Sequence, residues 1–155
     1  EFRPFAPSVL EEKAADYFDL LASSPYMLFV SPVKETRRKP QVFNNHSVSL
    51  WERLYHPRSD MPAITHLDFS ARVQTVNKTT NPRYWELLNA FDKKTGHALL
   101  INTSFNVRGE PIVCTPKDAY RCFMTTEMDY LVMGNYLYHK KEQPVWEEKE
   151  HRLQK

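Results

Sequence analysis

The sequence predicts an α/β sandwich that forms a single domain. Segments typical of strands alternate with segments typical of helices along the 155 residues, as in a sheet covered by helices. A chain of this length normally forms one domain with its own core. Hydrophobic residues make up 41% of the chain and the net charge is only +2, so the composition excludes general disorder.

The composition also excludes several kinds of function. With only three glycines the chain has no glycine-rich phosphate loop, so arginines, amides and helix ends would have to hold a phosphate. The small net charge does not indicate a dedicated nucleic-acid or membrane-surface binder, and no apolar run approaches the roughly 20 residues that span a bilayer. Neither the two cysteines nor the six histidines have metal-ligand spacing, so no metal site is expected.

In the first half of the chain, local patterns predict two helices and two strands. Ser8 and Glu11 have the spacing of a capping box, which predicts a helix from Ser8 to about Leu21. The apolar run 26–30 fits a strand buried on both faces. A long irregular segment, 31–62, follows, and such segments are commonly functional or mobile. The other elements are expected at 48–55, a short helix, and at 63–76, where residues alternate as in a strand.

The second half alternates helices with strands. Asn81 and Pro82 predict the start of a helix, which Gly96 ends as a left-handed cap. Thr115, followed by proline, predicts the start of another. In chain order the expected elements are a helix at 81–96, a strand at 98–101, a helix at 115–126, strands at 130–133 and 136–138, and a charged tail at 141–155.

A polar segment, residues 102–110, directly follows the strand predicted at 98–101. In α/β sheets, ligands bind outside the carboxyl ends of strands, and amide, hydroxyl and guanidinium groups can hold phosphate oxygens. The alternative is a well-bonded turn, because asparagine, serine and glycine are common turn formers, with the arginine paired to Glu110. The candidate ligand-binding residues are Asn102, Ser104, Asn106 and Arg108.

Two other parts of the chain offer candidate residues. Arg72 occupies a strand that is predicted to be mostly buried, so it needs an anionic ligand or an ion pair with Asp68 or Glu110. His66 is expected to be either a base or anion ligand, or a hydrogen-bonded core histidine. Arg3 lies between aromatics and prolines that would pre-organise it; the alternative is an exposed arginine at a frayed terminus.

These motifs resemble those of one family, the C-terminal domain of O-carbamoyltransferases of the nodulation and antibiotic-tailoring type. The resemblance covers about residues 1–138, and the string NTSFNVRGEP at 102–111 is its most specific part. The family usually has glycine after the aspartate of its second block, where this chain has Phe69, and phenylalanine suits a positive φ poorly. The matching blocks are FRPFAPSV at 2–9, THLD at 65–68, SARVQTV at 70–76, NPR at 81–83, and 100–113 with 115–123.

The resemblance implies a fold and a reaction. It implies a twisted mixed sheet with flanking helices, similar to the YrdC-like fold, at 1–140, cut from a larger enzyme and followed by the tail at 141–155. It also implies that this domain binds carbamoyl phosphate and ATP, with Mg²⁺ only through the ATP phosphates, and forms carbamoyladenylate with release of pyrophosphate. An N-terminal kinase-like domain would then pass the carbamoyl group to an acceptor hydroxyl.

On this basis we expect arginines and amides to do the catalytic work, since both substrates are polyanions. Arg3 and Arg72 would clamp phosphates, and Lys34 with its basic neighbours would cover the nucleotide. Arg108 would bind substrate or order its own loop. Arg72, Ser104 and Asn106 are the expected catalytic residues, and Asn102, Ser104 and Asn106 would orient the carbamoyl and phosphate oxygens.

Two other functions stay open at this point. The first is a non-catalytic nucleotide- or ligand-binding domain that acts only beside its partner domain, and the second is an RNA-binding YrdC-like module. Pyrophosphate release separates the first from an enzyme, and salt-dependent RNA affinity tests the second. Two reduced cysteines, without a signal peptide or a membrane span, lead us to expect a cytoplasmic protein.

Overall fold

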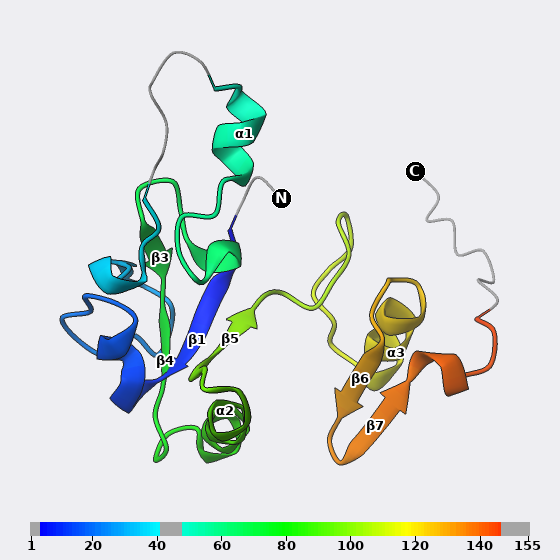
Figure 1. Ribbon diagram of the computed structural model, residues 1–155. Helices are drawn as coiled ribbons and strands as arrows, with labels where there is room; N and C mark the ends of the chain where they lie inside the picture. The colour runs from blue at the N-terminus through cyan, green and yellow to red at the C-terminus, as the bar shows by residue number, and fades with distance from the viewer. Residues whose placement is uncertain (1–3, 41–47, 147–155) are drawn as a thin grey trace. The chain divides into compact units, whose positions relative to one another are not determined.

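The computed structural model describes residues 4–40 and 48–146 and confirms the α/β class. Helices and small mixed sheets alternate along the chain (Figure 1). The chain divides into two compact units, residues 1–103 and 104–155, which are described separately. The prediction that 1–140 forms one domain stays a prediction.

The first unit is built on a three-stranded mixed sheet with the order β4-β1-β5. β1 (Ala6–Leu10) runs parallel to β4 (Gln74–Val76) and antiparallel to β5 (Leu99–Asn102). Every residue of β1 is buried, as befits the central strand. Val9 and Leu10 therefore lie in the core of this unit, together with residues such as Phe18, Val33, Ile64, Val73 and Leu88.

The helix predicted at 8–21 is wrong. Residues 6–10 form β1, and only Glu11–Asp16 are helical, as the short 3-10 helix η1. The hydroxyl of Ser8 does not cap a helix but donates to Gln74 Oε1 at 2.6 Å, across to β4. Leu21, the expected end of that helix, is fully exposed. Strand pairing on both sides of β1 overrides the local capping pattern.

The buried strand predicted at 26–30 is also wrong. Met27 has a positive φ of 55°, which breaks the extended backbone, and Tyr26, Leu28 and Phe29 are exposed. The strand that does form, β2 (Val30–Pro32), begins at the end of the apolar run and pairs antiparallel with β3 (Ser70–Arg72). An apolar run indicates a buried strand only when neighbouring elements cover it, and here they do not.

The irregular segment after β2 contains short helices. The 3-10 helix η2 covers Glu35–Arg37, and the predicted short helix is confirmed as α1 (Leu50–Tyr55), which Ser49 and Glu52 begin with a full capping box. Another 3-10 helix, η3 (Pro62–Ile64), leads back toward the strands. The strand predicted at 63–76 is thus shorter and divided at Val73 into β3 and β4.

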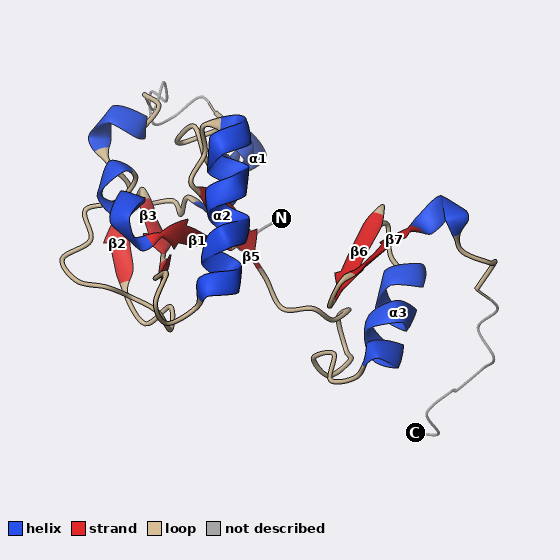
Figure 2. Ribbon diagram, turned by 90° about the horizontal axis from the view of Figure 1, so that it is seen from below, coloured by secondary structure: helices blue, strands red, loops and turns tan. Residues whose placement is uncertain are grey.

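The long helix α2 (Pro82–Thr95) follows the sequence prediction. Asn81 precedes Pro82 at the helix start, and Gly96, at φ 76°, ends the helix in the left-handed conformation that glycine tolerates. Leu88 buries its side chain in the core of the first unit. Figure 2 shows α2 beside the strands β1 and β5, which it contacts.

The second unit consists of a helix packed on a β-hairpin. The helix and the two strands are found where they were predicted. α3 (Pro116–Met124) begins with a capping box between Thr115 and Asp118, and β6 (Tyr130–Met133) pairs antiparallel with β7 (Tyr136–His139). Phe123 of α3 is fully buried against the hairpin. The short 3-10 helix η4 (Lys140–Glu142) follows, and residues 147–155 of the predicted tail lie outside the described part.

Candidate functional site

Arg72 and His66 line one cavity of the first unit. The cavity has a volume of about 240 Å³, and Pro4, Phe5 and Ala6 complete its lining. Arg72 ends β3 and is exposed, and within residues 4–40 and 48–146 no carboxylate forms an ion pair with it. The ion pair with Asp68, one of the alternatives left open, is therefore not formed, whereas the pairing with Glu110, which belongs to the other unit, stays a prediction. The guanidinium keeps its donors for a ligand, as an anion-binding arginine requires.

A tight turn at residues 66–70 presents His66 to this cavity. The backbone N–H of Phe69 donates to His66 O at 3.1 Å, and the N–H of His66 donates to Ser70 O at 2.8 Å. Phe69 takes the left-handed conformation, with φ 63°, where a side chain is strained. Phe69 thus holds a backbone conformation that favours glycine.

Asp68 and Ser70 brace the turn. Asp68 Oδ1 accepts from the hydroxyl of Ser70 at 2.6 Å and from its backbone N–H at 3.1 Å. Ser70 Oγ also lies 3.2 Å from Nδ1 of His66. The hydrogen bond from the Ser70 hydroxyl lowers the pKa of Asp68. An ionised carboxylate thus anchors a chain of contacts that ends on the ring of His66.

Asn102 lies at the end of β5 and takes part in a second polar cluster of the first unit. Its Nδ2 donates to Gln74 Oε1 at 2.7 Å, and the same oxygen accepts from Ser8 Oγ. Gln74 Nε2 donates in turn to Pro25 O at 3.1 Å. Gln74 therefore fixes the side chain of Asn102, a role that the sequence analysis did not assign. Its place on the polar side of a strand, two residues after Arg72, is the only signal in the sequence.

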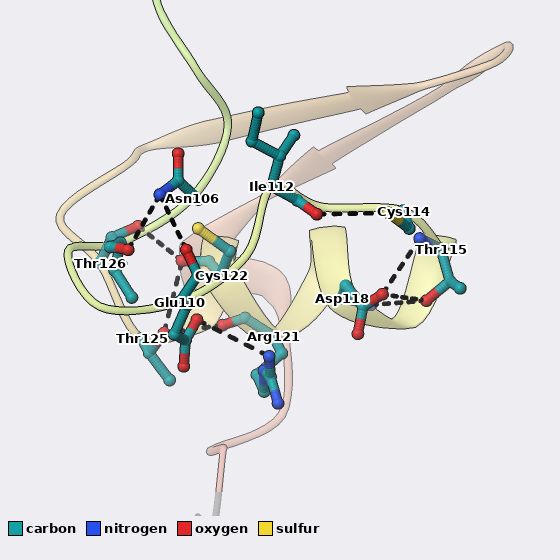
Figure 3. Close-up of polar contacts among 11 residues, drawn as sticks. Asn106, Glu110, Ile112, Cys114, Thr115, Asp118, Arg121, Cys122, Thr125 and Thr126 are labelled. Atoms are coloured by element: carbon teal, nitrogen blue, oxygen red, sulfur yellow. Dashed lines mark hydrogen bonds and ion pairs between the residues drawn. The ribbon is translucent and has the colours of Figure 1, made fainter.

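The predicted loop residues Ser104, Asn106 and Arg108 belong to the second unit. Asn106 Nδ2 donates to Val107 O at 3.0 Å and to Glu110 O at 3.1 Å, which closes the loop on itself (Figure 3). Both amide hydrogens are thus used within the loop. The carbonyl oxygen of Asn106 remains as an acceptor, which suits a ligand N–H better than a phosphate oxygen. Ser104 and Arg108 are exposed.

The pairing of Arg108 with Glu110 that was left open is not formed. Glu110 Oε2 instead lies 3.7 Å from Arg121 of α3, as Figure 3 shows. In the described part of the chain, no acidic group holds Arg108. Its guanidinium is consequently free for a ligand, as its predicted role in substrate binding requires.

The basic segment 34–39 is anchored to its own unit. Lys34 Nζ lies 2.6 Å from Asp19 Oδ1, and Arg37 donates to Asp60 Oδ2 at 2.7 Å. Arg38 donates from Nε to Val33 O at 2.8 Å. The proposed nucleotide contact of Lys34 would thus compete with an ion pair. The other predicted phosphate clamp, Arg3, lies outside the described residues.

In the described ranges, no helix has the length and apolar character needed to cross a bilayer. Both cysteines are free thiols; Cys114 is exposed and Cys122 is buried. Burial raises the pKa of the Cys122 thiol, which keeps it protonated and unreactive.

Comparison with known proteins agrees with the motifs. A family model described as the carbamoyltransferase C-terminus matches residues 1–140. The chain is 58% identical over 147 residues to an uncharacterized protein of Synechocystis sp., covering 95% of this chain and 24% of that protein. It is 44% identical over 143 residues to nodulation protein NolNO of Sinorhizobium fredii, covering 90% and 18%. It is 37% identical over 108 residues to nodulation protein U of Rhizobium tropici, covering 70% and 15%.

The chain thus spans about a quarter or less of the length of these curated relatives. The family match nevertheless includes nearly all of the 155 residues, and it contains Arg72, His66 and the loop at 102–110. The resemblance carried by the motifs is confirmed: this chain belongs to the carbamoyltransferase family, as its C-terminal part.

Proposed function

We propose that this chain binds carbamoyl phosphate and ATP and forms carbamoyladenylate, the activated donor of a carbamoyl group. The observation that carries the proposal is the position of Arg72, an exposed residue that lines a cavity with His66 and has no acidic partner in the described ranges. Family membership supports a transferase of this kind.

The size of the cavity supports a small anion at this position. Pockets for drug-sized ligands hold roughly 300–1,000 Å³, whereas this one holds about 240 Å³. Carbamoyl phosphate, or the phosphate end of a nucleotide, fits such a volume better than a whole ATP. Mg²⁺ would enter with ATP, bound through its phosphates rather than by a protein cage.

The proposed reaction needs positioning and fixed positive charge. Carbamoyl phosphate and water give carbamate and inorganic phosphate. A carbamate oxygen then bonds to the α-phosphorus of ATP, while the bond from that phosphorus to the bridging oxygen breaks and pyrophosphate leaves. Charge accumulates on phosphate oxygens in both steps, so a guanidinium aimed at them lowers the barrier without any protein nucleophile. Arg72 would serve this purpose, and Asn102, Ser104, Asn106 and Arg108 remain the predicted substrate-orienting residues.

The rest of the protein would complete the transfer. Because the matched parts are only 24% and 18% of the lengths of these two relatives, we place the site for the acceptor hydroxyl on a kinase-like domain of the same protein, outside these residues. A YrdC-like fold and a cytoplasmic location belong to the same proposal. The free thiols of Cys114 and Cys122 support a reducing compartment.

Pyrophosphate release from ATP tests the proposal. It is measured with and without carbamoyl phosphate, on the protein that carries this chain, on Arg72→Ala, and on Lys94→Ala, which removes an exposed charge from α2. We expect release that depends on carbamoyl phosphate, is lost in Arg72→Ala and persists in Lys94→Ala.

Each other outcome has a distinct meaning. Activity of Arg72→Ala equal to that of the unchanged protein would overturn the site. Ligand binding without release would support the non-catalytic alternative instead. RNA affinity that falls with salt, in a protein that binds neither substrate, would point to the RNA-binding module.

A further inference from the structure

We propose that His66 makes the cavity beside Arg72 selective for carbamoyl phosphate, by accepting a hydrogen bond at Nε2 from the NH₂ of the carbamoyl group. The inference rests on the proposed function and adds a specificity-determining residue to it. It concerns the distinction between carbamoyl phosphate and acyl phosphates of the same shape that have no N–H.

The position of the proton on His66 follows from its neighbour Ser70. The Ser70 hydroxyl gives its single hydrogen to Asp68 Oδ1, 2.6 Å away. His66 Nδ1 lies 3.2 Å from that hydroxyl oxygen, which then has only lone pairs to offer. Nδ1 must therefore carry the hydrogen, and the neutral ring has its acceptor lone pair on Nε2.

The ionisation of Asp68 disfavours the opposite arrangement, in which Asp68 would donate to Ser70 and Ser70 to His66. The hydrogen bond from Ser70 lowers the pKa of Asp68, so at neutral pH its carboxylate only accepts. The backbone N–H of Ser70, 3.1 Å from the same oxygen, adds a second donor to it. Asp68 and Ser70 act on the ligand through His66 and are positioning residues.

The backbone of the turn at residues 66–70 also supports a fixed position for His66. Phe69 holds a φ of 63° between Asp68 and Ser70, and such strain persists only where the surrounding structure enforces it. Two backbone hydrogen bonds close the turn, from His66 to Ser70 and from Phe69 to His66. The turn therefore fixes the backbone position of His66 and keeps Asp68 and Ser70 close to its ring.

The two cavity residues are complementary to one class of ligand. Arg72 offers only donors and suits phosphate oxygens, whereas Nε2 of His66 offers only an acceptor and has no hydrogen-bond partner in the part of the chain that the structure describes. Carbamoyl phosphate supplies an anion and an NH₂ group. Acetyl phosphate has the same shape but places a methyl group where the NH₂ would be, which leaves the acceptor unsatisfied.

Calorimetric titration with carbamoyl phosphate and with acetyl phosphate tests the inference. We expect the unchanged protein to prefer carbamoyl phosphate by about 10- to 100-fold. His66→Leu removes the acceptor and should bring the ratio of the two Kd values close to one. Ser70→Ala removes the hydroxyl that holds the hydrogen of His66 on Nδ1. It should lower the preference for carbamoyl phosphate in part and leave the Kd for acetyl phosphate unchanged. His97→Leu, at an exposed histidine of the same unit, should keep the full preference.

The outcomes separate the inference from the function on which it rests. Equal affinity of the unchanged protein for the two ligands, or a preference that survives in His66→Leu, would overturn the inference and leave the proposed function standing. Failure of both ligands to bind would overturn both. Because the readout is a ratio of affinities, a variant that is merely less stable would not imitate the expected result.

Discussion

Asn102 Nδ2 donates a hydrogen bond to Gln74 Oε1 at 2.7 Å, and this bond connects the two outer strands of the sheet in the first unit. Ser8, on the central strand between them, donates to the same oxygen at 2.6 Å. One glutamine side chain thus joins all three strands at the point where β5 enters the motif that identifies the family.

Removal of the Gln74 acceptor should destabilise the first unit. In Gln74→Met the side chain keeps its length, but Ser8 Oγ is left buried without its acceptor, which costs about 1–3 kcal/mol of unfolding free energy. Denaturant unfolding measures the loss. Ser8→Ala combined with Gln74→Met should recover part of it, because no buried hydroxyl then lacks a partner. Equal stabilities of the single and double variants would show that the Ser8 contact contributes nothing.

Elements that depend on adjacent residues were predictable from the sequence. α2 and α3 are found where Asn81-Pro82, Gly96 and Thr115 place their ends, because Pro82, the Gly96 cap and the Thr115 cap act within one helical turn; the side chain of Asn81 makes no capping hydrogen bond. The helix predicted at 8–21 was wrong because the hydroxyl of Ser8 bonds to Gln74, 66 residues away. A local pattern contains no information about such a partner.

In the site, too, features set by contacts in three dimensions were harder to predict than features set by nearby residues. Arg72 and His66 are six residues apart in the sequence, and the structure places both on one cavity, which the sequence analysis did not predict. Gln74 and Ser70 were missed because their importance comes from what they contact in three dimensions. Ser70 acts on His66 only through a closed turn, and Gln74 contacts strands that are distant in sequence.

Phe69→Gly should stabilise the protein relative to Phe69→Ala by about 1 kcal/mol, because only glycine adopts a φ of 63° without strain. Both variants lose the contact of the ring with the guanidinium of Arg38, which lies 5.4 Å from the ring centroid. The difference in stability between the two variants therefore reports the cost of the backbone conformation alone. Thermal unfolding of the two variants measures it. A higher Tm for Phe69→Ala would mean that the turn at 66–70 does not hold this backbone conformation.

Stability should fall in acid, in part because of Asp68. Its pKa is lowered in the folded state, mainly by the hydrogen bond from the Ser70 hydroxyl, so the folded protein binds this proton less readily than the unfolded chain. The contribution is complete above the unfolded pKa, near 4, and is lost as the pH falls through the folded value. Ser70→Ala should make the unfolding midpoint less dependent on pH below about 4. An unchanged acid dependence would mean that this hydrogen bond does not act on Asp68.

Lys34→Ala should weaken ATP binding several-fold, whereas Asp19→Ala should not. The ion pair between them, at 2.6 Å, joins side chains that are 39% and 45% exposed, so its own effect on stability is below about 1 kcal/mol. If Lys34 leaves the pair to bind a phosphate of the nucleotide, loss of Asp19 removes a competitor and leaves the Kd for ATP equal or lower. Loss of Lys34 removes a positive charge of the protein that would bind a phosphate of ATP, so the Kd for ATP rises. Calorimetric titration of ATP into both variants measures the two Kd values. Equal Kd values would show that Lys34 is a structural residue of the basic segment and does not bind ATP.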